Sequence, residues 1–302
     1  MIKNKDLKIR PGYIFIECKY SYPPSSEELK KALKDWADLG FEYIELEGVT
    51  PEHIAESNDN KRYIKNLCQD LGLTISNFIV ILPDIPSLFE EKRLQVFRLF
   101  DQAVEIADFF ECETMDLDSF TPSLNFEGGI PYLEVFPPDT PCKVTIPDNY
   151  SWSNQWEIFV NVISKCNLKA KNAGIKLAIH PRTYEIINGT DSFLRLADAV
   201  NDDNLGVILD TAHFHVQKEI LANSIYKLSG KIWHVHASDS DGHHMEHLSI
   251  GAGNIDWAEA IKALYRTGFK GQFVIDVGGS DLSEKYRKSK RRLEELCNRE
   301  VF

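Results

Sequence analysis

The segment IKLAIHPRTYEIINGTDSFLRLADAVNDDNLGVILD, residues 175–210, contains the pattern that decides the fold. Two short apolar runs, at 175–179 and 205–209, enclose a stretch at 191–200 whose apolar residues have helical spacing. A strand, a helix and a second strand in this order predict a parallel βαβ unit. Because both runs are almost wholly apolar, we expect the two faces of each strand to be buried.

The same alternation continues in both directions along the chain and predicts an α/β fold with eight strand–helix units. Eight such units favour closure into a (β/α)8 TIM barrel, formed by residues 1–302 as one domain. A Pro-, Gly- and Asp-rich stretch near 119–150 is too long for a turn, so we predict a loop insertion over one mouth of the barrel. The predicted strands are 13–19, 42–47, 74–80, 113–117, 175–179, 205–209, 231–235 and 272–277; the predicted helices are 26–39, 51–71, 87–110, 154–173, 191–200, 220–228, 257–267 and 282–297.

The bulk composition excludes several classes of protein. The chain has 302 residues, of which 43% are hydrophobic, so it can bury a sizeable core. Its formal net charge of -12 disfavours a nucleic acid partner, and we interpret the basic run at 285–292 as the solvated face of a helix. Six cysteines without a C-x-x-C pair fit a reducing compartment, and no apolar run reaches the length of a membrane span. We therefore expect a cytoplasmic protein without a membrane partner.

Four successive predicted strands end in imidazole or carboxylate side chains. In a barrel of this type, chemistry collects at the carboxyl ends of the strands, where the following loops converge. An isolated aspartate there is often a helix N-cap, and an isolated histidine is often a hydrogen-bonding residue, but four in succession favour one shared site. Imidazole and carboxylate are ligands of Mn, Co, Fe and Zn. The predicted metal ligands are His180, Asp210, His236 and Asp276.

The local sequence refines two of these assignments. In DTAH, residues 210–213, a turn after Asp210 could direct His213 into the same cavity. His234 and His236 are two residues apart on a strand and therefore point to the same side. His236 lies nearer the mouth, so we predict that it binds the metal while His234 has a supporting role.

Several motifs resemble one known superfamily. They are DTAH at 210–213, IWHVHASD at 232–239, IGAGNIDW at 250–257 and FEYIE at 41–45. Together they resemble the sugar phosphate isomerase/epimerase superfamily, whose members are xylose isomerase-like TIM barrels. The specific motifs lie mostly between residues 175 and 277.

The resemblance implies one divalent metal ion, of which Mn, Co, Zn and Mg are the candidates. Members hold it with Glu, Asp, His and Glu from strands five to eight; Asp210 and His236 match, whereas His180 and Asp276 replace the two glutamates. In epimerase-type members those glutamates also form the acid–base pair. The segment HPRTYE, residues 180–185, looks more like inosose dehydratases, and Glu185 could then be an alternative ligand or base.

The implied activity is a metal-dependent isomerase or epimerase that removes a proton beside the carbonyl of a small sugar, keto-sugar or polyol. Two alternatives remain: a dehydratase or related lyase, and a barrel subunit without catalysis. Manganese is one metal that fits, and a homo-oligomer is compatible with the resemblance. His180, at an unperturbed pKa of about 6.5, would serve as a base at neutral pH. The candidate catalytic residues are His180, Asp276, His213 and Glu185, and the candidate substrate-binding residues are Arg182, His213, Glu45 and His247.

Two other activities are less consistent with the sequence. His243-x-x-Glu-His247 has the spacing of a class of zinc proteases, but that chemistry needs both histidines on one helix, and glycines flank this segment. Abasic-site endonucleases share the barrel superfamily and use three metals with more His and Glu ligands. The early predicted strands end in Lys19, Glu47 and Val80 and lack those histidines.

Overall fold

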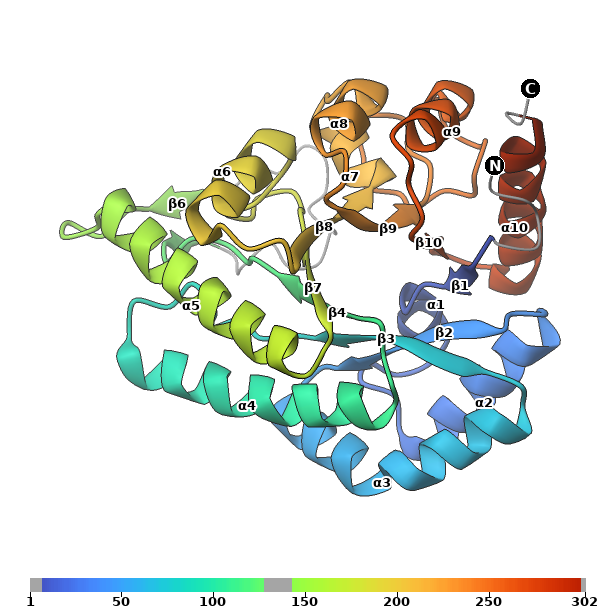
Figure 1. Ribbon diagram of the computed structural model, residues 1–302, viewed down its shortest axis with the longest axis horizontal. Helices are drawn as coiled ribbons and strands as arrows, with labels where there is room; N and C mark the ends of the chain where they lie inside the picture. Colours follow the sequence, from blue (N-terminus) through green and yellow to red (C-terminus); the bar gives the residue numbers. More distant parts are fainter. Residues whose placement is uncertain (1–6, 128–142, 300–302) are drawn as a thin grey trace.

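The computed structural model describes residues 7–127 and 143–299, and its centre is a barrel of parallel strands (Figure 1). Its strands are hydrogen-bonded in the order β1-β10-β9-β8-β7-β4-β3-β2, and β1 also packs beside β2, so the barrel is nearly closed. This confirms the predicted TIM barrel. The strands are β1 (Ile9–Pro11), β2 (Tyr43–Gly48), β3 (Thr74–Val80), β4 (Thr114–Asp118), β7 (Lys176–His180), β8 (Leu205–Asp210), β9 (Ile232–Ala237) and β10 (Gln272–Ile275).

Helices surround the barrel on its outside (Figure 1). α2 illustrates why they begin where they do: Ser25 and Glu28 form a reciprocal capping box at its N-terminus. No helix in the described part of the chain is long and apolar enough to cross a membrane. The helices are α1 (Ile14–Lys19), α2 (Ser26–Asp38), α3 (Pro51–Asp70), α4 (Glu90–Phe109), α5 (Trp152–Asn172), α6 (Thr190–Val200), α7 (Thr211–Val216), α8 (Leu221–Lys227), α9 (Trp257–Arg266) and α10 (Leu282–Arg299).

The prediction of a first strand at 13–19 is wrong. The strand is the preceding segment β1, and 14–19 forms the helix α1. A short apolar run does not distinguish a strand from a buried helical turn. Phe15 and Ile16, adjacent in sequence, are both fully buried, and the Phe15 ring packs edge-on against Tyr286 of α10 with 5.0 Å between centroids. Burial of neighbouring residues does not separate the two structures here, because strands such as β8 are buried on both faces as well.

The predicted insertion near 119–150 lies partly outside the described residues, which exclude 128–142. On its two flanks, β5 (Asn125–Phe126) and β6 (Val144–Thr145) form a small antiparallel ladder. At its start, Ser119 and Phe120 are buried beside the barrel mouth.

Candidate metal centre

Strand register brings the predicted ligands together at the carboxyl end of the barrel. Asp210 on β8 is the direct cross-strand partner of His236 on β9. His180 ends β7, and its Nε2 lies 3.1 Å from Asp210 Oδ2. Asp276 follows β10, and its Oδ2 lies 3.7 Å from His236 Nδ1. Nitrogen or oxygen atoms of His180, Asp210 and His236 all lie within 4.8 Å of one another, which is close enough to share one ion.

Asp210 has two functions, one for each oxygen. Its Oδ1 accepts a hydrogen bond of 3.0 Å from the backbone N–H of His213 and caps the short helix α7. Its Oδ2 faces His180 and His236. Burial raises the pKa of Asp210, but the charge of His213 and the hydrogen bond from His180 outweigh it and lower the pKa to about 2. Asp210 is therefore ionised.

The surroundings of His236 suit a divalent cation. Its side chain is buried, yet neither ring nitrogen has a hydrogen-bond partner within the described part of the chain. The carboxylates of Asp210 and Asp276 lie 3.9 and 3.7 Å from Nδ1, which is beyond hydrogen-bond distance. A buried imidazole facing two carboxylates across such gaps is a donor set that divalent ions prefer. The residues present therefore fit a divalent metal ion.

His180 is held between two carboxylates, one of which the sequence analysis missed. Its Nδ1 lies 3.3 Å from Oδ1 of Asp118, its cross-strand partner on β4, and its Nε2 faces Asp210. Burial lowers the pKa of His180, but the hydrogen bonds to both carboxylates outweigh it and raise the pKa to about 10. This differs from the unperturbed pKa expected from the sequence. Asp118 directly follows the predicted strand 113–117, so a strand one residue longer would have placed it in the set of polar strand ends.

Arg182 and Glu185 lie next to Asp118. Arg182 Nη1 is 2.9 Å from Asp118 Oδ2. Burial raises the pKa of Asp118, but the charges of Arg182 and His180 outweigh it and lower the pKa to about 2. Glu185 lies outside the ligand cluster. Its Oε2 accepts three hydrogen bonds of 2.9 Å, from the N–H and hydroxyl of Ser119 and the N–H of Phe120. Burial raises the pKa of Glu185 to about 7.

Two further predicted residues contact the cluster from its sides. The His247 Nδ1 lies 3.1 Å from Asp276 Oδ2, so its imidazole orients that carboxylate. Burial raises the pKa of Asp276, but the charge of His247 outweighs it and the pKa is lowered. His213 packs edge-on against His180, with ring centroids 5.6 Å apart, and its Nδ1 accepts the N–H of Thr183.

Glu45 and His234 are held by groups of the barrel interior. Glu45 Oε2 lies 2.9 Å from Arg10 Nε and its Oε1 accepts the N–H of Tyr13, so both oxygens of this predicted substrate contact are engaged by the protein. His234 Nε2 lies 3.1 Å from Asp116 Oδ2, and burial lowers the pKa of His234 to about 3, so its ring is neutral.

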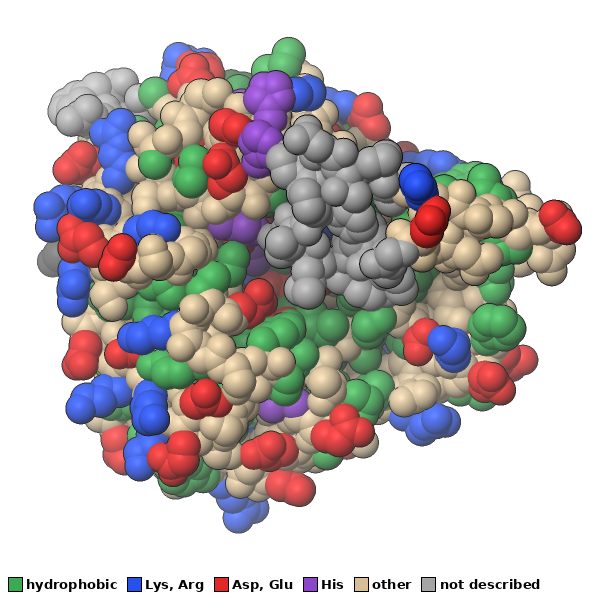
Figure 2. Space-filling model, turned by 180° about the vertical axis from the view of Figure 1, so that it is seen from behind, with side chains coloured by type: hydrophobic (Ala, Val, Ile, Leu, Met, Phe, Trp, Pro, Cys, Tyr) green, Lys and Arg blue, Asp and Glu red, His purple; other side chains and the backbone are tan. Residues whose placement is uncertain are grey.

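A cavity of about 650 Å³ opens above the cluster and is lined by His180, His236, Asp276 and Arg182, together with Glu47 and Tyr22. Its volume is that of a small-molecule site. On the face shown in Figure 2, histidine and acidic side chains gather at a hollow. The sequence analysis missed Tyr22, whose hydroxyl donates to Glu47 across 2.8 Å. The segment with His243 and His247 contains no helix, as the argument against a zinc protease expected.

Comparison with known proteins identifies the family. A model of the xylose isomerase-like TIM barrel matches residues 33–296. The chain belongs to this family. The L-ribulose 3-epimerase of Mesorhizobium japonicum is 23% identical over 88% of this chain and 81% of that enzyme. The inosose dehydratase of Lacticaseibacillus casei is 21% identical over 41% of this chain and 47% of its own length. This chain spans only about half of the length of several of the relatives that it matches.

Solved structures agree on the fold. A crystal structure of the IolI protein with a bound zinc atom superposes with a TM-score of 0.70 at 17% identity, covering 98% of this chain and 99% of that one. At this identity, the likeness shows the fold alone.

Proposed function

We propose that this protein is a divalent-metal-dependent epimerase or isomerase of a small keto-sugar or polyol. The observation that carries the proposal is the buried His236, which faces Asp210 and Asp276 without a hydrogen-bond partner among the described residues, beneath a cavity of about 650 Å³. Family membership and relatives that are keto-sugar epimerases support it.

Asp210 and His236 would hold the ion, with His180 and Asp276 at its two flanks. Strand order supports this arrangement, because β7 and β10 lie on either side of the β8–β9 pair. When bound, a divalent ion polarises a carbonyl oxygen and stabilises the negative charge that develops on it. Manganese, cobalt, zinc and magnesium are the candidates.

The two flanking residues are in opposite protonation states at neutral pH, which suits an acid–base pair. Asp276 is ionised, so its carboxylate can act as the base that removes the proton from the carbon beside the carbonyl. His247 orients its carboxylate. His180, with its raised pKa, is the acid that returns a proton, and Asp118 fixes its ring. Proton return to carbon gives an epimer or an isomer.

A dehydratase is the second candidate. His180 is charged beside Asp118 and Asp210, so it can also protonate a leaving hydroxyl group. Loss of that hydroxyl as water after proton removal gives an unsaturated or dehydrated product instead of an epimer. The relatives that are inosose dehydratases support this candidate.

The experiment is metal analysis combined with solvent exchange. The purified protein, Asp210→Ala, His236→Ala and the control Asp198→Ala would be assayed for bound divalent metal by mass spectrometry. Asp198 is the control because it is exposed on α6 and belongs to none of the described clusters that could hold an ion. Ketoses and inososes would then be incubated with protein in D2O and followed by NMR.

We expect metal in the wild type and the control only, and deuterium at the carbon beside the carbonyl of one substrate. Epimer formation supports the first candidate and loss of water the second. A protein that binds no divalent ion, gains no thermal stability from one and exchanges no deuterium would refute the proposal.

A further inference from the structure

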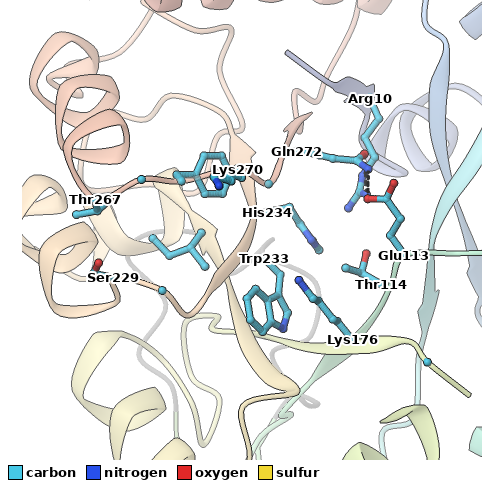
Figure 3. A pocket seen from close by; sticks show the side chains of 16 residues that line it. Arg10, Glu113, Thr114, Lys176, Ser229, Trp233, His234, Thr267, Lys270 and Gln272 are labelled. Atoms are coloured by element: carbon cyan, nitrogen blue, oxygen red, sulfur yellow. Dashed lines mark hydrogen bonds between the residues drawn. The ribbon is translucent and has the colours of Figure 1, made fainter. Parts of the chain in front are cut away.

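A second cavity lies at the opposite end of the barrel from the candidate metal centre. It has a volume of about 470 Å³ and is lined by the first residues of several strands, among them Thr114 of β4, Lys176 of β7 and Gln272 of β10 (Figure 3). Barrel chemistry occurs at the carboxyl ends of the strands, so this cavity at their amino ends is separate from the active site.

The inner end of this cavity contains two buried polar groups with unmatched hydrogen-bonding atoms. Arg10 and His234 are each 1% exposed and extend toward the same space in Figure 3. Arg10 Nε pairs with Glu45 and Nη1 with Ser76 and Gln272, whereas Nη2 has no partner among the residues described. His234 Nδ1 also lacks one. Buried polar groups nearly always have a hydrogen-bond partner, so we expect a bound group to supply one to each of these two atoms.

The two atoms require opposite groups from that partner. Arg10 Nη2 is a donor and needs an acceptor. His234 Nε2 faces the Asp116 carboxylate at 3.1 Å, which places the ring proton on Nε2 and leaves Nδ1 as an acceptor that needs a donor. A group with an acceptor oxygen and a hydroxyl side by side satisfies both.

The rim of the cavity favours an anion. Lys176 and Lys270 are exposed there, and neither forms an ion pair with any described residue; Lys176 Nζ instead lies 4.3 Å from the centre of the Trp233 ring. Among the described lining residues Glu113 is the one carboxylate, and it is already engaged by Lys8 at 2.6 Å and Gln272 at 3.2 Å. The cavity is therefore locally cationic in a protein with a net charge of -12.

We propose that this cavity binds a small hydroxycarboxylate, of the size and type of a sugar acid. Its hydroxyl groups would donate to His234 and accept from Arg10, its carboxylate would lie between Lys176 and Lys270, and its carbon chain would pack on Trp233. The proposal does not rest on the proposed reaction, and the cavity is a separate one from that above the metal centre, although His234 stacks on His236 with 5.4 Å between ring centroids.

Calorimetric titration of the full chain with D-gluconate tests the proposal. D-Sorbitol has the hydroxyl groups without the charge, hexanoate the charge without the hydroxyl groups, and inorganic phosphate is a different oxyanion. The rim variant is Lys176→Glu/Lys270→Glu. Its matched control is Lys30→Glu/Lys31→Glu, which makes the same charge change on α2 at exposed lysines. A Lys176→Gln/Lys270→Gln variant removes charge without adding repulsion, and thermal unfolding checks that each variant is folded.

We expect gluconate to bind at least tenfold more tightly than sorbitol or hexanoate. The Glu rim variant should weaken gluconate at least tenfold, the Gln variant by less, and the control not at all. Because hydroxycarboxylates also chelate metals, Asp210→Ala serves as a separate arm and should retain the binding. Binding that survives the rim variant, or that disappears in Asp210→Ala alone, overturns the proposal. Phosphate binding as tight as that of gluconate overturns the ligand class.

Discussion

The pH dependence of stability gives the sharpest test of how His180 is held. In protein stripped of metal by a chelator, the imidazole lies between the carboxylates of Asp118 and Asp210, which raise its pKa from 6.5 to about 10. A group whose pKa is raised on folding stabilises the protein fully below its unfolded pKa. That contribution is lost as the pH rises through the folded pKa. The window is therefore pH 6.5 to about 10.

The size of the effect follows from the shift. At about 1.4 kcal/mol per pKa unit, a rise from 6.5 to about 10 corresponds to at most about 5 kcal/mol of stability below pH 6.5 and about 4 kcal/mol at pH 7. Urea unfolding of chelator-treated wild type and His180→Gln between pH 6 and 10.5 measures it. The stability difference between the two proteins should shrink steadily across this window. The exposed His243→Gln variant serves as the control for the loss of an imidazole outside the barrel mouth.

Adding a divalent ion should reverse the trend. The charged imidazole of His180 repels a cation held by Asp210 and His236, so metal affinity should rise with pH as His180 loses its proton. The stability gained from added metal should then be larger in the wild type at pH 9 than at pH 6.5, and this difference between the two pH values should be smaller in His180→Gln. In the metal-free protein, the difference in the free energy of unfolding between wild type and His180→Gln should fall with pH. A difference that stays constant from pH 6.5 to 10 would refute the placement of His180 between two carboxylates.

Three further predictions concern groups around the site, each measured by urea unfolding. Arg10→Met should destabilise the protein by about 3–5 kcal/mol because it leaves the buried carboxylate of Glu45 unpaired. Adding Glu45→Leu should recover much of the loss, and a double variant that is destabilised as much as Arg10→Met alone would contradict this. Glu185→Ala should cost about 1–3 kcal/mol, since three donors after β4 lose their acceptor, and an unchanged unfolding midpoint would show that these bonds contribute nothing. Gly206→Ala should cost about 1–3 kcal/mol, because a Cβ there would lie 2.2 Å from Trp233 Nε1. Trp233→Leu should relieve that cost, and no relief would argue against the steric cause.

Much of the fold was predictable because its signal is local. Most of the barrel strands after the first are short runs rich in apolar residues, each followed by a helical stretch, and this periodicity is visible in neighbouring residues. The prediction of the first strand was wrong because the local signal is weak there. β1 has only three residues, and the apolar run after it forms a helix in which Phe15 packs against Tyr286 of α10. That contact joins distant parts of the chain and leaves no local pattern.

The sequence by itself determined which residues would meet at the mouth of the barrel. Parallel strands all end at the same edge, so polar residues at the ends of strands five to eight had to converge: His180, Asp210, His236 and Asp276. Only the tertiary structure decided what each atom does there. Cross-strand register sets Asp118 beside His180 and gives the two oxygens of Asp210 separate partners, and burial then shifts the proton affinities of the whole group. These effects depend on distances of a few ångströms between strands far apart in sequence, and residue order alone does not specify them.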